Sequence, residues 1–297
     1  MSRLVVALAQ YPLDPLRHEQ AWRAKMERWV EAGAGTGAKL LVFPEYGAME
    51  LAHLDGPEAS GDLQRAIDAV SARLGLQAEW LAQLSQRYAV TIVAPSGPAR
   101  RGAVTWNVAR VLTPKGGRGE ARKSIPTPWE REPWGVEGDA GQGPLLFEVD
   151  GVPVGLAICY DIEFPLIARR LAEHGAKLIL APSCTETDHG WQRVRRAAAA
   201  RALENQCYVA HCPLIGEAPW CPPVEAQTGA AGVWAPMDGP FPASGAVVEG
   251  ARDEPGWIVA ELDFAALDAV RREGGVRGFA HWSEQPGADP LPAPRRL

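Results

Sequence analysis

The sequence predicts an α/β fold, and three observations support this prediction. Short runs of branched and small apolar residues, typical of buried strands, recur along the 297-residue chain. Stretches whose apolar residues have helical spacing separate these runs. Several runs stop at a proline, as at Pro44, Pro95 and Pro182. In such folds the carboxyl ends of the strands gather along one edge of the sheet, where ligands bind.

The first half of the chain alternates strands with helices. The helix expected after the first strand carries Trp22, Met26 and Val30 at helical spacing and ends in a glycine-rich stretch. A pair of strands that resembles a hairpin closes this half, with glycines between its members. Strands are expected at about 4–9, 38–43, 89–94, 104–112 and 120–123. Helices are expected at about 17–32, 62–74 and 77–88.

The second half begins with a long irregular segment, 124–143, that is rich in Pro, Gly and Trp. A loop of this length in a compact domain is usually functional. A second irregular section is expected at 212–230. Strands are expected at about 145–149, 152–158, 177–181, 206–211, 232–235, 246–248 and 257–262. Helices are expected from 164 onward, at about 188–205 and at 264–272.

No linker, shift in composition or internal repeat divides the chain. We therefore predict one domain over residues 1–297, with an irregular, proline-rich tail from about 283. The net charge of −6 gives no electrostatic reason to bind nucleic acid or an anionic membrane surface.

The chain also carries few signs of export or membrane insertion. No apolar run approaches the ~20 residues that a membrane helix needs. The stretch 1–10 becomes polar too soon for a signal peptide and is interpreted as the first strand. Five cysteines, an odd number without metal-binding spacing, favour a reducing compartment. We expect a cytoplasmic protein without a metal site.

The segment 152–165, VPVGLAICYDIEFP, combines a buried strand, a short polar turn and the start of a helix. Cys159 stands where the strand ends, near the positive end of the helix dipole. Both features favour a thiolate and leave space for a ligand. The alternative is that Cys159 is a small buried hydrophobic residue, as most free cysteines are.

Two other polar side chains follow strands, namely Glu45 and Lys123. If the strand ends meet, a carboxylate, an ammonium and a thiol come together. The carboxylate can take the thiol proton and later give it to a leaving amine. The lysine can stabilise an oxyanion, with the backbone N–H of Tyr160 as a second donor. The alternative interpretation of Glu45 alone is a helix cap or a surface charge, and that of Lys123 alone is a solvated residue at a strand end.

Three segments in the same order resemble the motifs of the nitrilase superfamily of carbon–nitrogen hydrolases. These are LLVFPEYGAMEL (40–51), ARKSIPTPWERE (121–132) and GLAICYDIEFP (155–165), and RALENQCYV (201–209) also fits. The resemblance extends from the first strand to about Trp282. It implies a four-layer αββα sandwich and subunits that pair into a homodimer or a higher homo-oligomer. It also implies that Glu45 is the general base, Lys123 the oxyanion stabiliser and Cys159 the nucleophile.

The family has a second glutamate after the lysine, which orients the lysine and contacts the substrate. Glu130 matches it better than Glu132, because of its distance to Trp134 and to the glycine that follows. Two more acidic residues have structural interpretations. Asp161 is expected to accept hydrogen bonds from the turn amides after Cys159, and Glu163 to cap the helix that starts at 164.

The reaction is expected to be amide hydrolysis. Cys159-Tyr160-Asp161 resembles the amidase and carbamoylase branches, whereas true nitrilases carry Cys-Trp-Glu. The small amide would form a thioester at Cys159, and this chemistry requires no metal or organic cofactor. N-carbamoyl hydrolysis and nitrile hydrolysis on the same scaffold are alternatives, as is a binding protein with a relic site.

Aromatic and basic residues in the irregular segments are candidates for the pocket. Trp134 and His189 are expected near the substrate, and an aromatic wall would suit an apolar acyl group. Packing in the core or between subunits is the alternative for each tryptophan. Arg193 can bind a carboxylate, but a solvated or subunit-facing position explains it equally well. The tryptophans concerned are Trp129, Trp134, Trp191 and Trp220.

Overall fold

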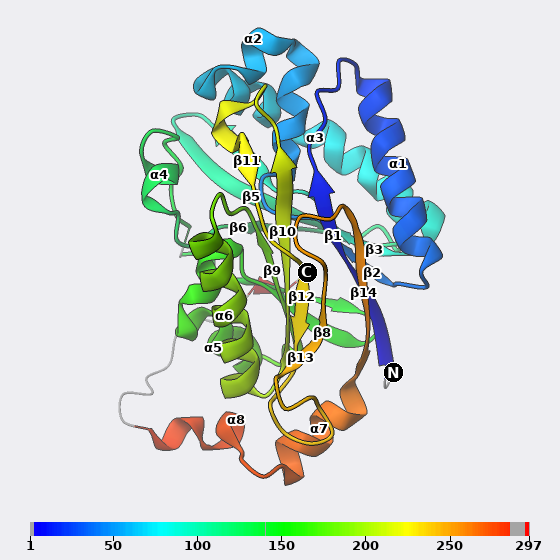
Figure 1. Cartoon of the computed structure of the whole chain (residues 1–297), viewed down its shortest axis with the longest axis vertical. Helices are drawn as coiled ribbons and strands as arrows, with labels where there is room; N and C mark the ends of the chain where they lie inside the picture. The colour runs from blue at the N-terminus through cyan, green and yellow to red at the C-terminus, as the bar shows by residue number, and fades with distance from the viewer. Residues whose placement is uncertain (1–2, 140, 286–294, 297) are drawn as a thin grey trace.

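The computed structural model describes residues 3–139, 141–285 and 295–296. The strands form one hydrogen-bonded network that folds into two sheets, and helices cover the outer face of each sheet (Figure 1). These layers confirm the predicted αββα sandwich. Most of the expected proline-rich tail, 286–294, lies outside the described residues.

The first sheet has the order β14-β1-β2-β3-β5-β6, and β4 pairs along the other half of β5. The strands β1, β2 and β3 are parallel, and β5 is antiparallel to both β3 and β6. The bounds are β1 Arg3–Pro12, β2 Leu40–Val42, β3 Thr91–Val93, β4 Gly97–Arg101, β5 Val104–Leu112, β6 Arg118–Arg122 and β14 Gly256–Asp263. The sequence did not predict β4. All five of its residues pair with residues of β5, and this pairing defines it as a strand.

The second sheet has the order β15-β7-β8-β9-β10-β12-β13. The strands β8, β9 and β10 are parallel. The bounds are β7 Leu145–Val149, β8 Val152–Leu156, β9 Leu178–Ser183, β10 Tyr208–Glu217, β11 Ala226–Gln227, β12 Gly232–Trp234, β13 Ala246–Glu249 and β15 Arg295–Arg296.

The prediction that a strand ends at 211 and an irregular section follows was wrong, because β10 continues to Glu217. The first part of β10 pairs with β9, and its last part pairs with β1 and with β11. The residues CPLIGE (212–217) have the sequence character of a loop, but neighbouring strands form hydrogen-bonded pairs with them. This crossing strand joins the two sheets through the pairs Tyr11–Leu214 and Pro12–Ile215.

Helices α1 and α3 cover the first sheet, and α5 and α6 cover the second (Figure 1). The two helical stretches predicted at 62–74 and 77–88 are one helix of 26 residues. Gly75 lies inside this helix, and a Cβ at its position would meet nothing within 4 Å, so close packing does not require a glycine there. The helix bounds are α1 Glu19–Gly35, α2 Pro57–Ser60, α3 Leu63–Tyr88, α4 Pro128–Arg131, α5 Pro165–Glu173, α6 Asp188–Asn205, α7 Phe264–Glu273 and α8 Gly278–His281.

Four short 3₁₀ segments complete the fold: η1 Gly47–Asp55, η2 Cys159–Glu163, η3 Pro222–Val224 and η4 Trp282–Glu284. The segment 124–143 contains α4, a single turn that the sequence did not predict. Within the described ranges, no helix combines the length and the apolar character needed to cross a membrane.

The strand directions determine where the functional side chains meet. Because β1 is parallel to β2 and to β10, the central strands of both sheets point the same way. The strand β6 shares this direction, since it is two antiparallel steps from β3. Chain segments that leave β2, β6, β8 and β9 therefore emerge at one edge of the sandwich.

Candidate active site

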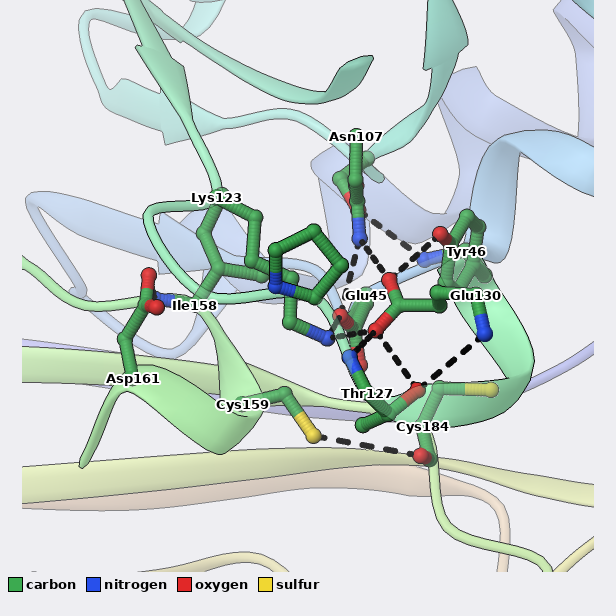
Figure 2. A network of polar contacts seen from close by, with 12 residues as sticks. Glu45, Tyr46, Asn107, Lys123, Thr127, Glu130, Ile158, Cys159, Asp161 and Cys184 are labelled. Carbon is green, nitrogen blue, oxygen red and sulfur yellow. Dashed lines mark hydrogen bonds and ion pairs between the residues drawn. The ribbon is translucent and has the colours of Figure 1, made fainter. Parts of the chain in front are cut away.

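Glu45, Lys123 and Glu130 form a buried cluster at this edge (Figure 2). Lys123 Nζ lies 2.8 Å from Glu45 Oε1 and 2.5 Å from Glu130 Oε2. All three side chains are at most 1% exposed. The lysine therefore bridges two carboxylates, one that follows β2 and one in the turn α4.

Cys159 begins η2, three residues after the last residue of β8, and its side chain lies next to the same cluster (Figure 2). Its backbone φ of +48° lies in the left-handed region, which is unfavourable for residues other than glycine. Such strain is typical of functional turns. Its Sγ lies 3.9 Å from the carbonyl oxygen of Cys184, which follows β9.

The charges in the cluster shift one another's pKa values. Burial raises the pKa of Glu45 to about 7, although the charge of Lys123 opposes this shift. Burial and then the charge of Glu45 raise the pKa of the Cys159 thiol well above its usual value. Burial alone would lower the pKa of Lys123, but the charges of Glu45 and Glu130 outweigh it and raise that pKa. The expectation that the turn favours a thiolate was therefore wrong: above pH 7 the site holds a neutral thiol beside a carboxylate that can accept its proton.

These shifts predict the pH dependence of any reaction that uses Glu45 as a base. Only the ionised carboxylate accepts a proton, so kcat/KM should fall about tenfold per pH unit below about pH 7. The measurement is kcat/KM for an amide between pH 5 and 9, with the protein shown to remain folded by circular dichroism. An acid limb near pH 4.5, the value of an ordinary glutamate, would contradict this assignment.

Asn107 in the middle of β5 connects the two carboxylates. Its Nδ2 donates to Glu45 Oε1 at 2.8 Å and to Glu130 Oε1 at 3.3 Å. Its Oδ1 accepts from the Ser96 hydroxyl at 2.7 Å. Sequence reasoning missed Asn107, and the only signal was a polar residue inside an apolar strand. The position is buried, so its amide needs partners.

Two residues next to the predicted site hold Glu130 in place. The Tyr46 hydroxyl donates to Glu130 Oε1 at 2.6 Å. The backbone N–H and the hydroxyl of Thr127 donate to Glu130 Oε2 at 2.8 and 2.9 Å. Glu130 is thus the N3 residue of a capping box in α4 as well as a partner of Lys123. Glu132, the alternative, is exposed and does not border the cavity described below.

Two predicted structural roles were wrong. Asp161 accepts hydrogen bonds from backbone amides, but that of Ile158 precedes Cys159, and the other two belong to residues 124 and 125. Glu163 does not cap α5, which has no side-chain cap and begins with a proline that lacks an N–H. Instead Glu163 Oε1 lies 3.4 Å from Arg193 Nε.

A cavity of about 120 Å³ lies against Glu45, Lys123 and Cys159. Its remaining wall includes Tyr160, Trp129, Thr185, Glu186, Glu163, Arg193 and Val194. The other candidates lie elsewhere. Trp134 is buried behind Tyr46, with ring centroids 4.8 Å apart, and His189 borders a separate outer groove. Trp191 and Trp220 do not border the cavity.

Carboxylate, ammonium and thiol groups line the cavity. In the part of the chain that the structure describes, no group of three or more His, Cys, Asp or Glu side chains is placed to hold a metal ion. The five cysteines are all buried and free.

Glu45, Lys123 and Cys159 thus lie together around one cavity at one edge of the αββα sandwich. A family model described as carbon-nitrogen hydrolase matches residues 5–239. The chain belongs to this family, and the resemblance to the nitrilase superfamily is confirmed.

Three similar proteins illustrate the relationship. "Probable hydrolase YhcX" of Bacillus subtilis is 29% identical over 273 residues, which are 92% of this chain but only 52% of the relative's length. "Omega-amidase, chloroplastic" of Arabidopsis thaliana is 28% identical and covers 91% of this chain and 70% of its own length. The crystal structure of XC1258 from Xanthomonas campestris, a CN-hydrolase superfamily protein, has a TM-score of 0.76 at 20% identity and covers 98% of this chain and 100% of its own.

Proposed function

We propose that this protein hydrolyses a small linear amide through a thioester at Cys159. One observation carries the proposal, namely the buried contact of Lys123 with two carboxylates beside the Cys159 thiol. A buried ion cluster is costly to desolvate, and charged groups with shifted pKa values beside a cavity are typical of catalytic sites.

The proposed reaction has two halves. In the first, Cys159 Sγ attacks the amide carbonyl carbon while Glu45 takes the thiol proton. Lys123 stabilises the oxyanion of the tetrahedral intermediate. The intermediate collapses, the carbon–nitrogen bond breaks, and Glu45 gives its proton to the departing nitrogen. Ammonia or an amine leaves, and the acyl group stays on Cys159 as a thioester.

In the second half, a water molecule attacks the thioester while Glu45 accepts one of its protons. The carbon–sulfur bond breaks, the carboxylic acid leaves, and the sulfur regains its proton. Glu130 touches Lys123 in both halves, and we assign it the role of holding the lysine in place. The Arabidopsis relative that is named an omega-amidase supports an amide as substrate. The modest cavity volume supports a small one.

The test is ammonia release from a panel of linear amides, N-carbamoyl compounds and nitriles, with product acids identified by mass spectrometry. We expect turnover of at least one small amide and formation of the matching acid. If the protein turns over only N-carbamoyl compounds or only nitriles, that class of compound is its substrate and the amide proposal is wrong. Absence of turnover across the whole panel would favour a binding protein with a relic site.

A further inference from the structure

A buried carboxylate reaches from the turn that carries Cys159 to the segment that carries Lys123. Asp161 is 2% exposed. Its Oδ1 accepts a hydrogen bond from the backbone N–H of Ile125 at 2.9 Å. Its Oδ2 accepts one from the backbone N–H of Ser124 at 3.1 Å. These two amides directly follow Lys123 in the chain.

The same carboxylate also holds the backbone just before the nucleophile. Asp161 Oδ2 accepts from the backbone N–H of Ile158 at 3.3 Å. Asp161 belongs to η2, the turn that carries Cys159, and lies outside the cluster of Lys123 and its two glutamates (Figure 2). One side chain thus joins two segments that are about 36 residues apart and that enter the site from different sheets.

We propose that Asp161 is a positioning residue, which sets the place of Lys123 Nζ relative to Cys159 Sγ by binding the amides of both segments. This inference rests on the proposed function. Lys123 follows the strand β6 at the start of a long loop, where its backbone N–H donates to the Asn107 carbonyl and its carbonyl accepts from the Asp139 N–H. Asp161 adds the restraint that links this segment to the turn of Cys159. Cys159 has a strained backbone that its surroundings must hold.

The chemistry of Asp161 suits this task. Charged acceptors make stronger hydrogen bonds to backbone N–H groups than neutral ones do. Burial raises the pKa of Asp161 to about 6, while the charge of Lys123 and the three amides oppose the shift. The side chain is therefore ionised at pH 8 and can accept from all three N–H groups.

The decisive variant is Asp161→Asn, assayed at pH 8. The side-chain amide keeps one acceptor oxygen and turns a donor toward backbone donors. In either orientation of the amide, the N–H of Ser124 or that of Ile125 faces this donor, so the lysine segment shifts away from the turn of Cys159. We expect kcat to fall about 100-fold, because a shift of about 1 Å between reacting groups costs that much, with KM changed by less than about threefold. Alkylation of Cys159 by iodoacetamide should slow in parallel.

The matched control is Asp139→Asn. Asp139 belongs to the same loop and pairs with Arg122 at 2.8 Å, but its side chain does not bind the amides of 124 and 125. We expect kcat to stay within about threefold of the wild-type value. An equal loss of kcat in both variants would mean that any loosening of the loop matters and would overturn the specific role of Asp161.

Asp161→Ser decides the matter if Asp161→Asn does not fold, because serine removes the carboxylate without placing a donor against the amides. Thermal midpoints from circular dichroism and kcat per folded protein separate stability from positioning. Wild-type kcat and alkylation rate in a folded variant, beside an inactive Cys159→Ala protein, would overturn the positioning role alone. Activity in Cys159→Ala would instead overturn the proposed function.

Discussion

Replacing Cys159 with alanine is expected to lower kcat/KM for amide hydrolysis by at least about 10⁴-fold, since loss of a nucleophile removes the covalent route entirely. The fold should persist. Cys159 is 5% exposed, and its hydrogen bond to the Cys184 carbonyl is long at 3.9 Å. Glu45, the other neighbour of the thiol, keeps Lys123 and Asn107 as partners in the alanine variant. Ammonia release measures the effect, and the thermal midpoint should change by only a few degrees.

The control for this change is Cys207→Ala, which makes the same truncation at a buried thiol away from the cavity. Activity there should equal that of the wild type. The thioester can be sought directly by quenching the wild-type reaction in acid and mapping the acylated peptide by mass spectrometry. Activity of Cys159→Ala within tenfold of the wild type would contradict the proposed mechanism.

Replacing Glu45 with glutamine is expected to lower kcat/KM about 10³-fold, within the range that general acid–base catalysis contributes. The amide cannot take the thiol proton or return it to the leaving nitrogen. Lys123 keeps Glu130 as a charged partner, so the cluster should still assemble. The pH profile supplies the second readout, because the acid limb near pH 7 should vanish together with the carboxylate that causes it.

Glu50→Gln is a closely matched control. Glu50 is also fully buried and also pairs with a lysine, Lys25, but it does not border the cavity. It further accepts a hydrogen bond from the Tyr11 hydroxyl at 2.7 Å. We expect this variant to lose thermal stability and to keep the kcat of the wild type per folded protein. If both variants lose kcat to a similar extent, the effect of Glu45→Gln comes from removing a buried charge and not from removing a catalytic base.

Sequence reasoning captured the parts of the protein that local pattern encodes. Apolar runs and helical spacing predicted most strands and helices and the α/β class. Polar residues at strand ends singled out Glu45, Lys123 and Cys159, and the order of their motifs indicated the family and the sandwich. The structure brings these three residues to one cavity.

Local pattern failed where a residue's environment depends on distant partners. The second half of β10 looks like a loop until β1 and β11 pair with it. Asn107 looks like an isolated polar residue in a strand until the fold places Glu45 and Glu130 beside it. The partners of Asp161 could not be deduced either, because two of its three amides lie in the lysine segment.

The order of residues along the chain thus specifies which side chains stand at the strand ends. Their protonation and their contacts depend on the folded arrangement of segments that are distant in the chain. A carboxylate reaches a pKa of about 7 because the assembled sheets and turns exclude water from it, and no neighbour in the chain does this. The same assembly sets one lysine between two carboxylates, with the thiol of Cys159 beside the same cavity.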